Sequence, residues 1–237
     1  MKIAVAYVVV THGPISDQYC ARFVSTWKEY PPLVDCDLVV LANGGPLSLE
    51  LSLILHPLNP IFFPRENDPG HDISAYQSAS RGPCADYDAV LCLGESVYFH
   101  REGWLKRLVQ AWERYGPGMY GPFSSNAVRA HLNTTAFLCT PSLLKNYSQR
   151  VHDRLSRYEF EHGIKPLWRR ASEQGMPVRL VTWDGEWEPH RWRMPRNILW
   201  RGDQSNLLLW CNHSDGYANA DAKIKAEWAR RCDAPFR

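Results

Sequence analysis

The chain has 237 residues, of which 45% are hydrophobic and 22% are charged, as in an ordinary globular protein. Its 27 lysines and arginines and 25 aspartates and glutamates leave a net charge of +2, which is too small to attract nucleic acid or an anionic membrane. These numbers exclude a disordered chain, a collagen and a coiled coil, and the length suits one large α/β core, since single domains of roughly 200–250 residues are common.

The first half of the chain alternates between β-branched apolar runs and segments in which apolar residues have helical spacing. Strands are predicted at 3–10, 37–42, 61–63 and 89–93, and helices at 17–30, 47–55, 73–81 and 103–115. This order predicts an α/β fold with a mostly parallel, doubly wound (Rossmann-like) sheet and right-handed crossovers. A ligand site is expected at the carboxyl ends of its strands.

The second half is less regular. Strands are predicted at 134–139 and 178–182 and helices at 164–174 and 218–231, and a polar turn precedes an apolar run over 201–210. No internal repeat, low-complexity stretch or linker interrupts the chain, so we expect one continuous domain over residues 1–237.

The seven cysteines and the apolar segments bear on the compartment. The cysteine count is odd and no C-x-x-C pair occurs, so the sequence indicates neither a zinc ribbon nor a disulfide framework. No apolar run approaches the roughly 20 residues that span a bilayer. Residues 1–10 read as a strand that runs into a loop rather than as a signal peptide. We expect a cytoplasmic protein without a transmembrane segment.

Two familiar motifs stand where they cannot bind their usual ligands. Residues 116–121 spell G-x-G-x-x-G but follow a predicted helix and contain a proline, so we interpret them as a helix-terminating loop. The D-x-D pairs at 35–37 and 86–88 precede their strands and therefore lie at the amino edge of the sheet, opposite the expected site. Serine-esterase, Walker A, metalloprotease and EF-hand patterns do not occur in the sequence.

Polar residues gather instead after two predicted strands. The segment 64–76 is a dense polar turn that opens a helix, as suits a nucleotide phosphate and ribose, although Asp72 could serve only as the helix N-cap. Glu95 directly follows a buried strand, so its carboxylate should point into the cleft, unless it is a solvated loop acid.

The order of these segments resembles a nucleotide-sugar glycosyltransferase of the GT-A fold, of bacterial or viral type. Residues 93–99 (LGESVYF) are similar to the family's "L-D-x-D-x-Y-F" turn, and 65–75 are similar to its "R-N-x-G-x-x-x-A" segment. Residues 131–137 resemble the acceptor-side strand, and 158–163 fall where the family carries its catalytic acidic motif. The likeness spans about residues 1–215 and implies a donor half at 1–115 and an acceptor half at 116–237.

The resemblance implies a transfer of a hexosyl or deoxyhexosyl group from a nucleotide-diphosphate donor to a hydroxyl acceptor, in surface polysaccharide or glycan synthesis. The donor contacts it implies are His12, Arg65, Asn67, Asp72, Tyr76 and Glu95. The acceptor contacts are Trp183, Trp187 and Asp203.

Such a transfer needs a base for the acceptor hydroxyl and a group that stabilises the leaving diphosphate. Glu161 is the expected base, with Glu159 and Asp184 as the alternatives. On a strand, Glu159 and Glu161 would share a face, so one of the two could be structural.

One departure from the family concerns the metal. The paired aspartates of its D-x-D motif are replaced by Gly94-Glu95-Ser96, and a single carboxylate is a poor site for Mn²⁺ or Mg²⁺. His213 or Asp215 could complete such a site. We favour metal-independent activity, with Arg65 or His12 neutralising the phosphates. The alternative is a catalytically silent module that binds a nucleotide sugar or carbohydrate, and either protein could be a homodimer.

Overall fold

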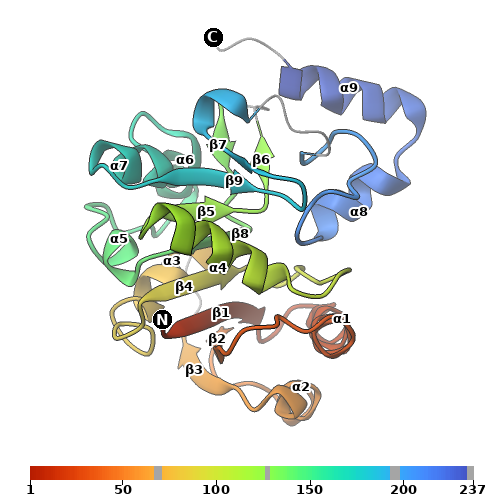
Figure 1. The fold of residues 1–237 in the computed structure, drawn as a ribbon. Coiled ribbons are helices and arrows are strands. Elements are labelled where there is room, and N and C mark those ends of the chain that lie inside the picture. The colour runs from red at the N-terminus through yellow and green to blue at the C-terminus, as the bar shows by residue number, and fades with distance from the viewer. Residues whose placement is uncertain (67–70, 126–128, 193–197, 234–237) are drawn as a thin grey trace.

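The computed structural model describes residues 1–66, 71–125, 129–192 and 198–233, and its centre is an eight-stranded sheet with helices on both faces (Figure 1). The strand order is β10-β9-β5-β8-β4-β1-β2-β3. These strands are β1 (Ile3–Val10), β2 (Asp37–Asn43), β3 (Ile61–Arg65), β4 (Ala89–Leu93), β5 (Met119–Gly121), β8 (Ala136–Cys139), β9 (Val178–Val181) and β10 (Glu186–Trp187). A separate hairpin pairs β6 (Ser124–Ser125) with β7 (His131–Leu132).

The helices follow the predicted alternation in the first half and are shorter in the second. They are α1 (Ser16–Glu29), α2 (Leu49–Leu55), α3 (His71–Ala79), α4 (Trp104–Tyr115), α5 (Pro141–Lys145), α6 (Arg154–His162), α7 (Leu167–Glu173), α8 (Asn212–Asn219) and α9 (Ala222–Asp233), with short 3₁₀ turns at His56–Leu58 and Pro189–Arg191.

The core lies on both faces of the sheet, and the two-residue period of β1 explains how. Val5 and Tyr7 are buried against α1, α2 and α4, whereas Ala4 and Ala6 are buried with residues of α3, α5, α6 and α7. Successive side chains of a strand point to opposite faces, so a strand covered on both sides is apolar throughout. The uninterrupted apolar run of β1 therefore reflects its central position.

The sheet is mostly parallel, which confirms the expected α/β class. The pairs β1–β2, β1–β4, β2–β3 and β5–β9 are parallel, and β8 lies antiparallel between β4 and β5. Between β5 and β8 the chain forms the β6–β7 hairpin rather than a crossover helix. Antiparallel neighbours need no such crossover, so this connection suits the reversed direction of β8.

The structure confirms the interpretation of both misplaced motifs. Gly116 ends α4 with a φ of 93°, a conformation that favours glycine, and β5 begins at Met119. At the amino edge, Asp37 accepts a hydrogen bond from the Tyr87 hydroxyl at 2.7 Å, and Asp88 accepts one from the backbone N–H of Lys2 at 2.6 Å. These aspartates tie the strand entrances together.

Two expectations about the second half were wrong in detail. The predicted helix 218–231 is two helices, because Ala220 is extended with a ψ of 152° and Asp221 accepts a hydrogen bond from the N–H of Ile224, which opens α9. Residues 158–162, considered as a strand, lie on α6.

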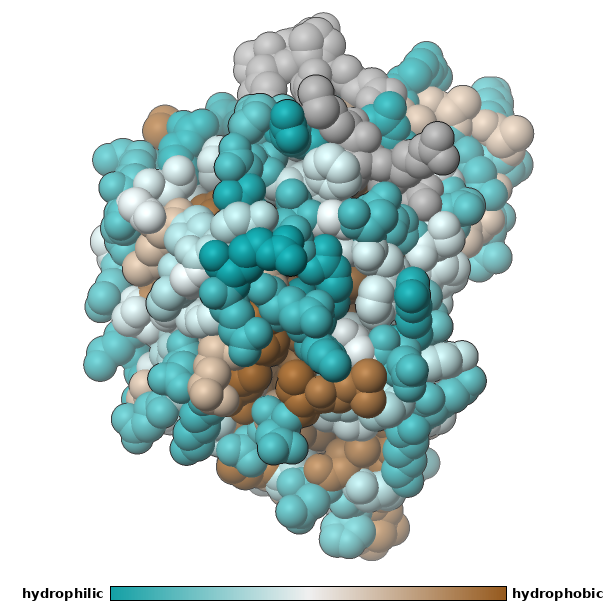
Figure 2. All heavy atoms as spheres, in the orientation of Figure 1, coloured by the Kyte–Doolittle hydropathy of each residue, from teal (hydrophilic) through white to brown (hydrophobic). Residues whose placement is uncertain are grey.

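The surface is mainly polar on the side that carries α4. Figure 2 shows hydrophilic side chains over most of this face, with apolar side chains gathered mainly in its lower half. Among the described residues, no helix combines the length and the apolar character needed to cross a membrane.

Candidate functional site

Three neighbouring cavities run along the carboxyl ends of β1, β2 and β4, at the edge of the sheet next to α1 and α8 in Figure 1. Their volumes are about 370, 240 and 250 Å³. The first and second share Val10 and Asn43 as lining residues, and the second and third share Asp72, Glu95 and Arg157. We call this row of cavities the cleft. Its position is the one at which open α/β sheets bind ligands.

The first cavity is lined largely by turns at the ends of β1 and β2. Gly44 and Gly45 have φ values of 119° and 110°, and both N–H groups donate to the carbonyl oxygen of Arg65, at 3.0 and 2.8 Å. His12 is exposed and lines the cavity, as expected of a donor contact. The guanidinium of Arg65 donates to the side-chain oxygen of Asn43, so it braces the wall of this cavity.

Glu95 lies between the ends of β4 and β1. Its Oε1 accepts a hydrogen bond from the N–H of Val10 at 2.8 Å, and its carbonyl oxygen accepts one from the Tyr7 hydroxyl at 2.7 Å. Burial raises the pKa of Glu95, although hydrogen bonds from Ser16 and Val10 oppose the rise. Glu95 lines two of the three cavities, and its role toward a donor stays a prediction.

Asp72 lines the same two cavities from α3. It belongs to the first turn of that helix rather than capping it, and its Oδ1 accepts from the N–H of Ile73 at 3.1 Å. Arg157 Nη2 lies 3.4 Å from the same oxygen. Burial raises the pKa of Asp72, with Arg157 opposing the rise and Glu161 adding to it.

Arg157 is a cation of the cleft that the sequence had not indicated. It lies on α6, and its guanidinium Nη2 contacts Asp72 at 3.4 Å. Its Nε is buried and has no hydrogen-bond partner within the described part of the chain. Helical spacing would have found it, because Arg157 precedes Glu161 by one turn on the same helix.

Glu161, the expected base, is held by several donors. Its Oε1 accepts from the N–H and the hydroxyl of Thr134 at 2.8 and 3.0 Å, and His162 Nε2 lies 3.2 Å from Oε2. Burial alone would raise the pKa of Glu161, but these hydrogen bonds and the charges of His162 and His131 lower it to about 2. The charge of Glu161 acts on Asp72 and on His213, so the structure brings it near the cleft.

The third cavity ends at the N-terminus of α8. Asn212 and His213 line this cavity with Tyr19 and Thr135. Burial lowers the pKa of His213, and Glu161 opposes that shift. His213 therefore lies in the same cavity as Glu95, as the sequence suggested.

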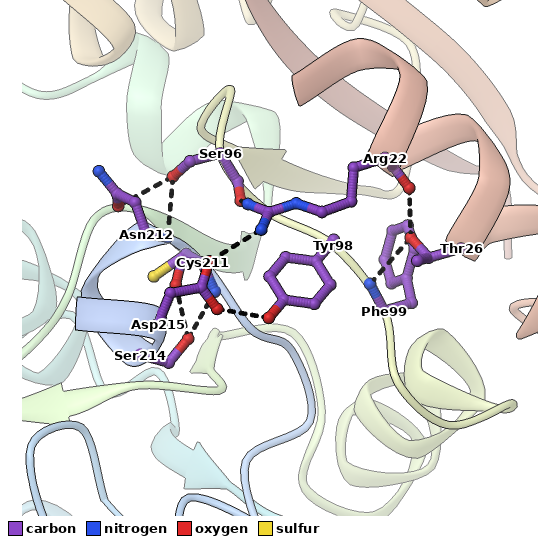
Figure 3. Close-up of polar contacts among 9 residues, drawn as sticks. All are labelled: Arg22, Thr26, Ser96, Tyr98, Phe99, Cys211, Asn212, Ser214 and Asp215. Carbon is purple, nitrogen blue, oxygen red and sulfur yellow. Dashed lines mark hydrogen bonds and ion pairs between the residues drawn. The ribbon is translucent and has the colours of Figure 1, made fainter. Parts of the chain in front are cut away.

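A network of polar contacts fixes α8 beside the loop after β4 (Figure 3). Arg22 of α1 pairs with Asp215 at 2.8 Å, donates to the carbonyl oxygen of Ser96 at 3.1 Å and lies 3.9 Å over the ring of Tyr98. Tyr98 also donates to Asp215, and Ser96 donates to Asn212 at 3.0 Å. Asp215 is thus used in this network, which leaves it unsuited to complete a metal site with Glu95.

One of the expected donor contacts is not at the cleft surface. Tyr76 is fully buried, with its ring 5.7 Å from that of Phe137, so it is a core residue and the expectation that it touches the donor was wrong. Asn67 lies outside the described residues.

Glu159, the first alternative base, lies against Gly163. The contact is so close that a Cβ atom added to this glycine would be 2.0 Å from Glu159 Oε2. Two residues apart on a helix, Glu159 and Glu161 face different directions.

The tryptophan-rich turn after β9 has its own set of contacts. Asp184 accepts from the Thr182 hydroxyl and the Asn206 amide, both at 2.6 Å, and these hydrogen bonds outweigh burial and lower its pKa. Trp187 donates to Thr182 at 3.2 Å, and the ring of Trp183 lies under Arg101 at 4.4 Å.

Asp203 accepts hydrogen bonds from the N–H and hydroxyl of Ser205, at 3.0 and 2.7 Å, which fold the neighbouring turn. Asp184, Trp183, Trp187 and Asp203 do not line the three cavities of the cleft. Their roles toward an acceptor stay predictions.

No protein-family model and no curated protein sequence matches this chain. Among solved structures, it is similar to TarS from S. aureus, with 15% identity, a TM-score of 0.46 and coverage of 62% of this chain and 30% of that one. It is also similar to HddC from Yersinia pseudotuberculosis complexed with GMP-PN, with 9% identity, a TM-score of 0.47 and coverage of 69% and 85%. A third is mannosyltransferase PcManGT from Pyrobaculum calidifontis in complex with GDP-Man and Mn²⁺, with 11% identity, a TM-score of 0.43 and coverage of 62% and 46%.

Proposed function

We propose that the cleft binds a nucleoside-diphosphate sugar and that the chain transfers the sugar to a hydroxyl group of a glycan or another acceptor. The observation that carries this proposal is the row of three cavities at the carboxyl ends of β1, β2 and β4, in which Asp72, Glu95 and Arg157 meet. An elongated donor with a base, a diphosphate and a sugar needs such a row. The acceptor would belong to a surface polysaccharide or other glycan, as the sequence resemblance implies.

The donor is oriented by the charges along the cleft. The first cavity, beside His12 and the glycines that follow β2, takes the nucleoside. The diphosphate lies in the second cavity, where the unpartnered Nε of Arg157 offers a charged donor. The sugar reaches the third cavity, next to Asn212 and His213 at the N-terminus of α8, where the partial positive charge of the helix also favours the phosphates.

Asp72 is suited to take the proton of the acceptor hydroxyl. A general base works best when its pKa approaches the working pH, and burial raises the pKa of Asp72. The acceptor oxygen forms a bond to the anomeric carbon of the sugar while the bond from that carbon to the phosphate oxygen breaks. The proton passes to Asp72, and the electron pair leaves with the diphosphate, whose growing charge Arg157 stabilises.

Glu161 remains the competing base from the sequence. Its carboxylate accepts hydrogen bonds from both donors of Thr134, and its pKa of about 2 makes it a weak proton acceptor. Asp72 and Glu161 can be separated by their amide variants, as described in the Discussion.

The residues of the cleft do not fit Mg²⁺ or Mn²⁺ well. These cations prefer several oxygen ligands. Here Glu95 already accepts a hydrogen bond from Val10, Asp72 accepts one from Ile73 and faces Arg157, and His213 offers nitrogen. We therefore propose a metal-independent transfer in which Arg157 supplies the positive charge.

The alternative is a nucleotide-sugar- or carbohydrate-binding module without catalysis. The feature that favours it is the single carboxylate in Gly94-Glu95-Ser96. Radiolabelled UDP-, GDP- and dTDP-sugars, incubated with the protein with and without Mn²⁺ and with EDTA, decide between the two. Slow hydrolysis or transfer that survives EDTA supports the enzyme, whereas binding without turnover supports the module.

Binding itself has a separate test. Occupation of the cleft should raise the melting temperature, since a ligand at a hundredfold excess over its Kd adds about 2.7 kcal/mol to stability. If UDP, GDP and dTDP at millimolar concentration all leave the melting temperature unchanged, the proposal for the cleft is wrong.

A further inference from the structure

A cluster of two histidines and one glutamate lies where α6 meets β7. His131 Nε2 is 3.9 Å from Glu161 Oε1, and His162 Nε2 is 3.2 Å from Glu161 Oε2. If one possible ligand atom is taken from each of the three residues, the three atoms lie within 4.8 Å of one another. The rings of His131 and His162 meet edge to face, with centroids 4.2 Å apart.

We propose that His131, Glu161 and His162 form a binding site for a Zn²⁺-type transition metal. Two imidazoles and one carboxylate are the ligand types that such cations prefer over Mg²⁺ and Ca²⁺. Ligand bonds of about 2.0–2.2 Å bring ligand atoms closer together than here, so the three side chains would contract slightly on binding. This inference does not depend on the binding of a nucleotide sugar.

The surroundings of each residue support a metal rather than a simple ion pair. The Nδ1 of His131 lies 2.7 Å from the carbonyl oxygen of Arg129, so Nδ1 carries the proton and Nε2 keeps its lone pair toward Glu161. The N–H and hydroxyl of Thr134 hold Oε1 of the carboxylate in place. In protein metal sites, a ligating histidine usually donates its other N–H to a carbonyl oxygen or a carboxylate, and a ligating carboxylate usually accepts a further hydrogen bond.

The burial of the two histidines also supports a metal site. The side chain of His131 is only 3% exposed, so its imidazole is enclosed beside the carboxylate of Glu161. His162 Nδ1 is buried and has no hydrogen-bond partner among the described residues. A buried polar atom without a partner marks a ring that the described chain does not fully satisfy, as is the case where a ligand is missing.

The site would act as a clip between distant parts of the chain. His131 belongs to β7, and Glu161 and His162 end α6, some thirty residues later. A bound metal would hold α6 against the β6–β7 hairpin and fix Arg157, one turn earlier, at the cleft. With three protein ligands, a fourth position stays open for water.

Co²⁺ is a suitable probe because its visible absorption reports coordination by protein ligands. Titration of the full chain, freed of metal with a chelator, should give a one-to-one complex with visible bands that Zn²⁺ displaces. His131→Gln and His162→Gln should each weaken Co²⁺ binding by at least about tenfold, the range seen even for residues of the second layer. Zn²⁺ should raise the melting temperature of the unaltered protein and leave that of the variants unchanged.

His152→Gln is the matched control, since His152 also faces a carboxylate, Asp153 at 3.7 Å, but is 61% exposed. It should bind Co²⁺ as the unaltered protein does. The proposal is overturned if the unaltered protein gives no bands at a severalfold excess of Co²⁺. The proposal is also overturned if folded His162→Gln binds Co²⁺ as tightly as the unaltered protein does. Such a result would be expected if the cysteines were the ligands.

Discussion

Asp72 at the cleft and Glu161 in the histidine cluster are both partly buried, and the charge of one acts on the pKa of the other. Asp72 accepts from the N–H of Ile73 at 3.1 Å and faces a guanidinium at 3.4 Å, and burial raises its pKa. Glu161 has two donors from Thr134 and a histidine at 3.2 Å, and its pKa falls to about 2. The pKa values of the two carboxylates differ because Glu161 has more and closer hydrogen-bond donors than Asp72, and not because one of them is more buried.

This difference assigns two kinds of chemistry to neighbouring groups. A carboxylate whose pKa is raised is a better proton acceptor than one whose pKa is lowered, whereas a carboxylate kept as an anion is suited to hold a cation. The residue that the sequence resemblance marks as the base therefore sits in the environment of a ligand, and a residue expected only to bind the donor sits in the environment of a base.

The largest effect is expected from Asp72→Asn, which keeps the size of the side chain but cannot take a proton. It should lower kcat by at least about a hundredfold, because general-base catalysis contributes about 10²–10⁴-fold, and should leave donor affinity nearly unchanged. Steady-state kinetics and calorimetry with the donor measure the two quantities.

Glu159→Gln, on the other side of α6, is the control for a carboxylate outside the cleft. If Glu161→Gln strongly lowers kcat and Asp72→Asn does not, then Glu161 is the base, as the sequence predicted, and Asp72 is not.

Arg157→Ala should have the next largest effect, on binding. Loss of a charge-assisted hydrogen bond costs about 1.5–3 kcal/mol, so the affinity for a nucleoside diphosphate should fall by roughly 10- to 100-fold. Calorimetric titration with UDP or GDP gives the value. Arg154→Ala, an exposed arginine in the first turn of the same helix, should change little. Equal losses in the two variants would mean that general charge, and not the cleft, attracts the ligand.

Burial acts on the pKa of both Asp72 and Glu161, and His100 is a residue at which the effect of burial can be measured with few other contacts. Both its ring nitrogens are buried and lack partners within the described residues, and burial lowers its pKa from 6.5 to about 4, with Arg101 adding to the shift. The unfolded chain therefore binds more protons between these values, so stability falls as the pH drops from 6.5 toward 4.

His100→Phe should remove roughly 1–2 kcal/mol of that acid-dependent loss, after a discount for partial exposure. Urea denaturation at pH 7 and pH 4.5 measures it. The same loss in the variant as in the unaltered protein would show that other groups cause it; His152→Gln, an exposed histidine, should not alter it.

The smallest effect is expected from Tyr76→Phe. The hydroxyl of Tyr76 is buried without a partner among the described residues, and the removal of such a group is close to neutral for stability. Nucleotide affinity should also stay unchanged, since Tyr76 is fully buried. A clear loss of affinity in this variant would restore Tyr76 as a donor contact.

The sequence by itself determined the local elements and the edge of the sheet that carries the site. The β-branched run at 3–10 and the helical spacing at 103–115 have a physical signature that acts within one segment, and both elements form where predicted. Glu95 could be placed because it directly follows a buried strand, and the carboxyl ends of parallel strands share one edge.

The tertiary structure alone decided which side chains meet. Asp72 and Arg157 are 85 positions apart, and Glu161 reaches His131 and Thr134 across 30 and 27 positions, contacts that no local pattern encodes. The direction of β8 and the helical state of residues 154–162 likewise follow from packing. The same holds for the pKa values, because desolvation and hydrogen bonds to a carboxylate exist only once the donors have been brought around it.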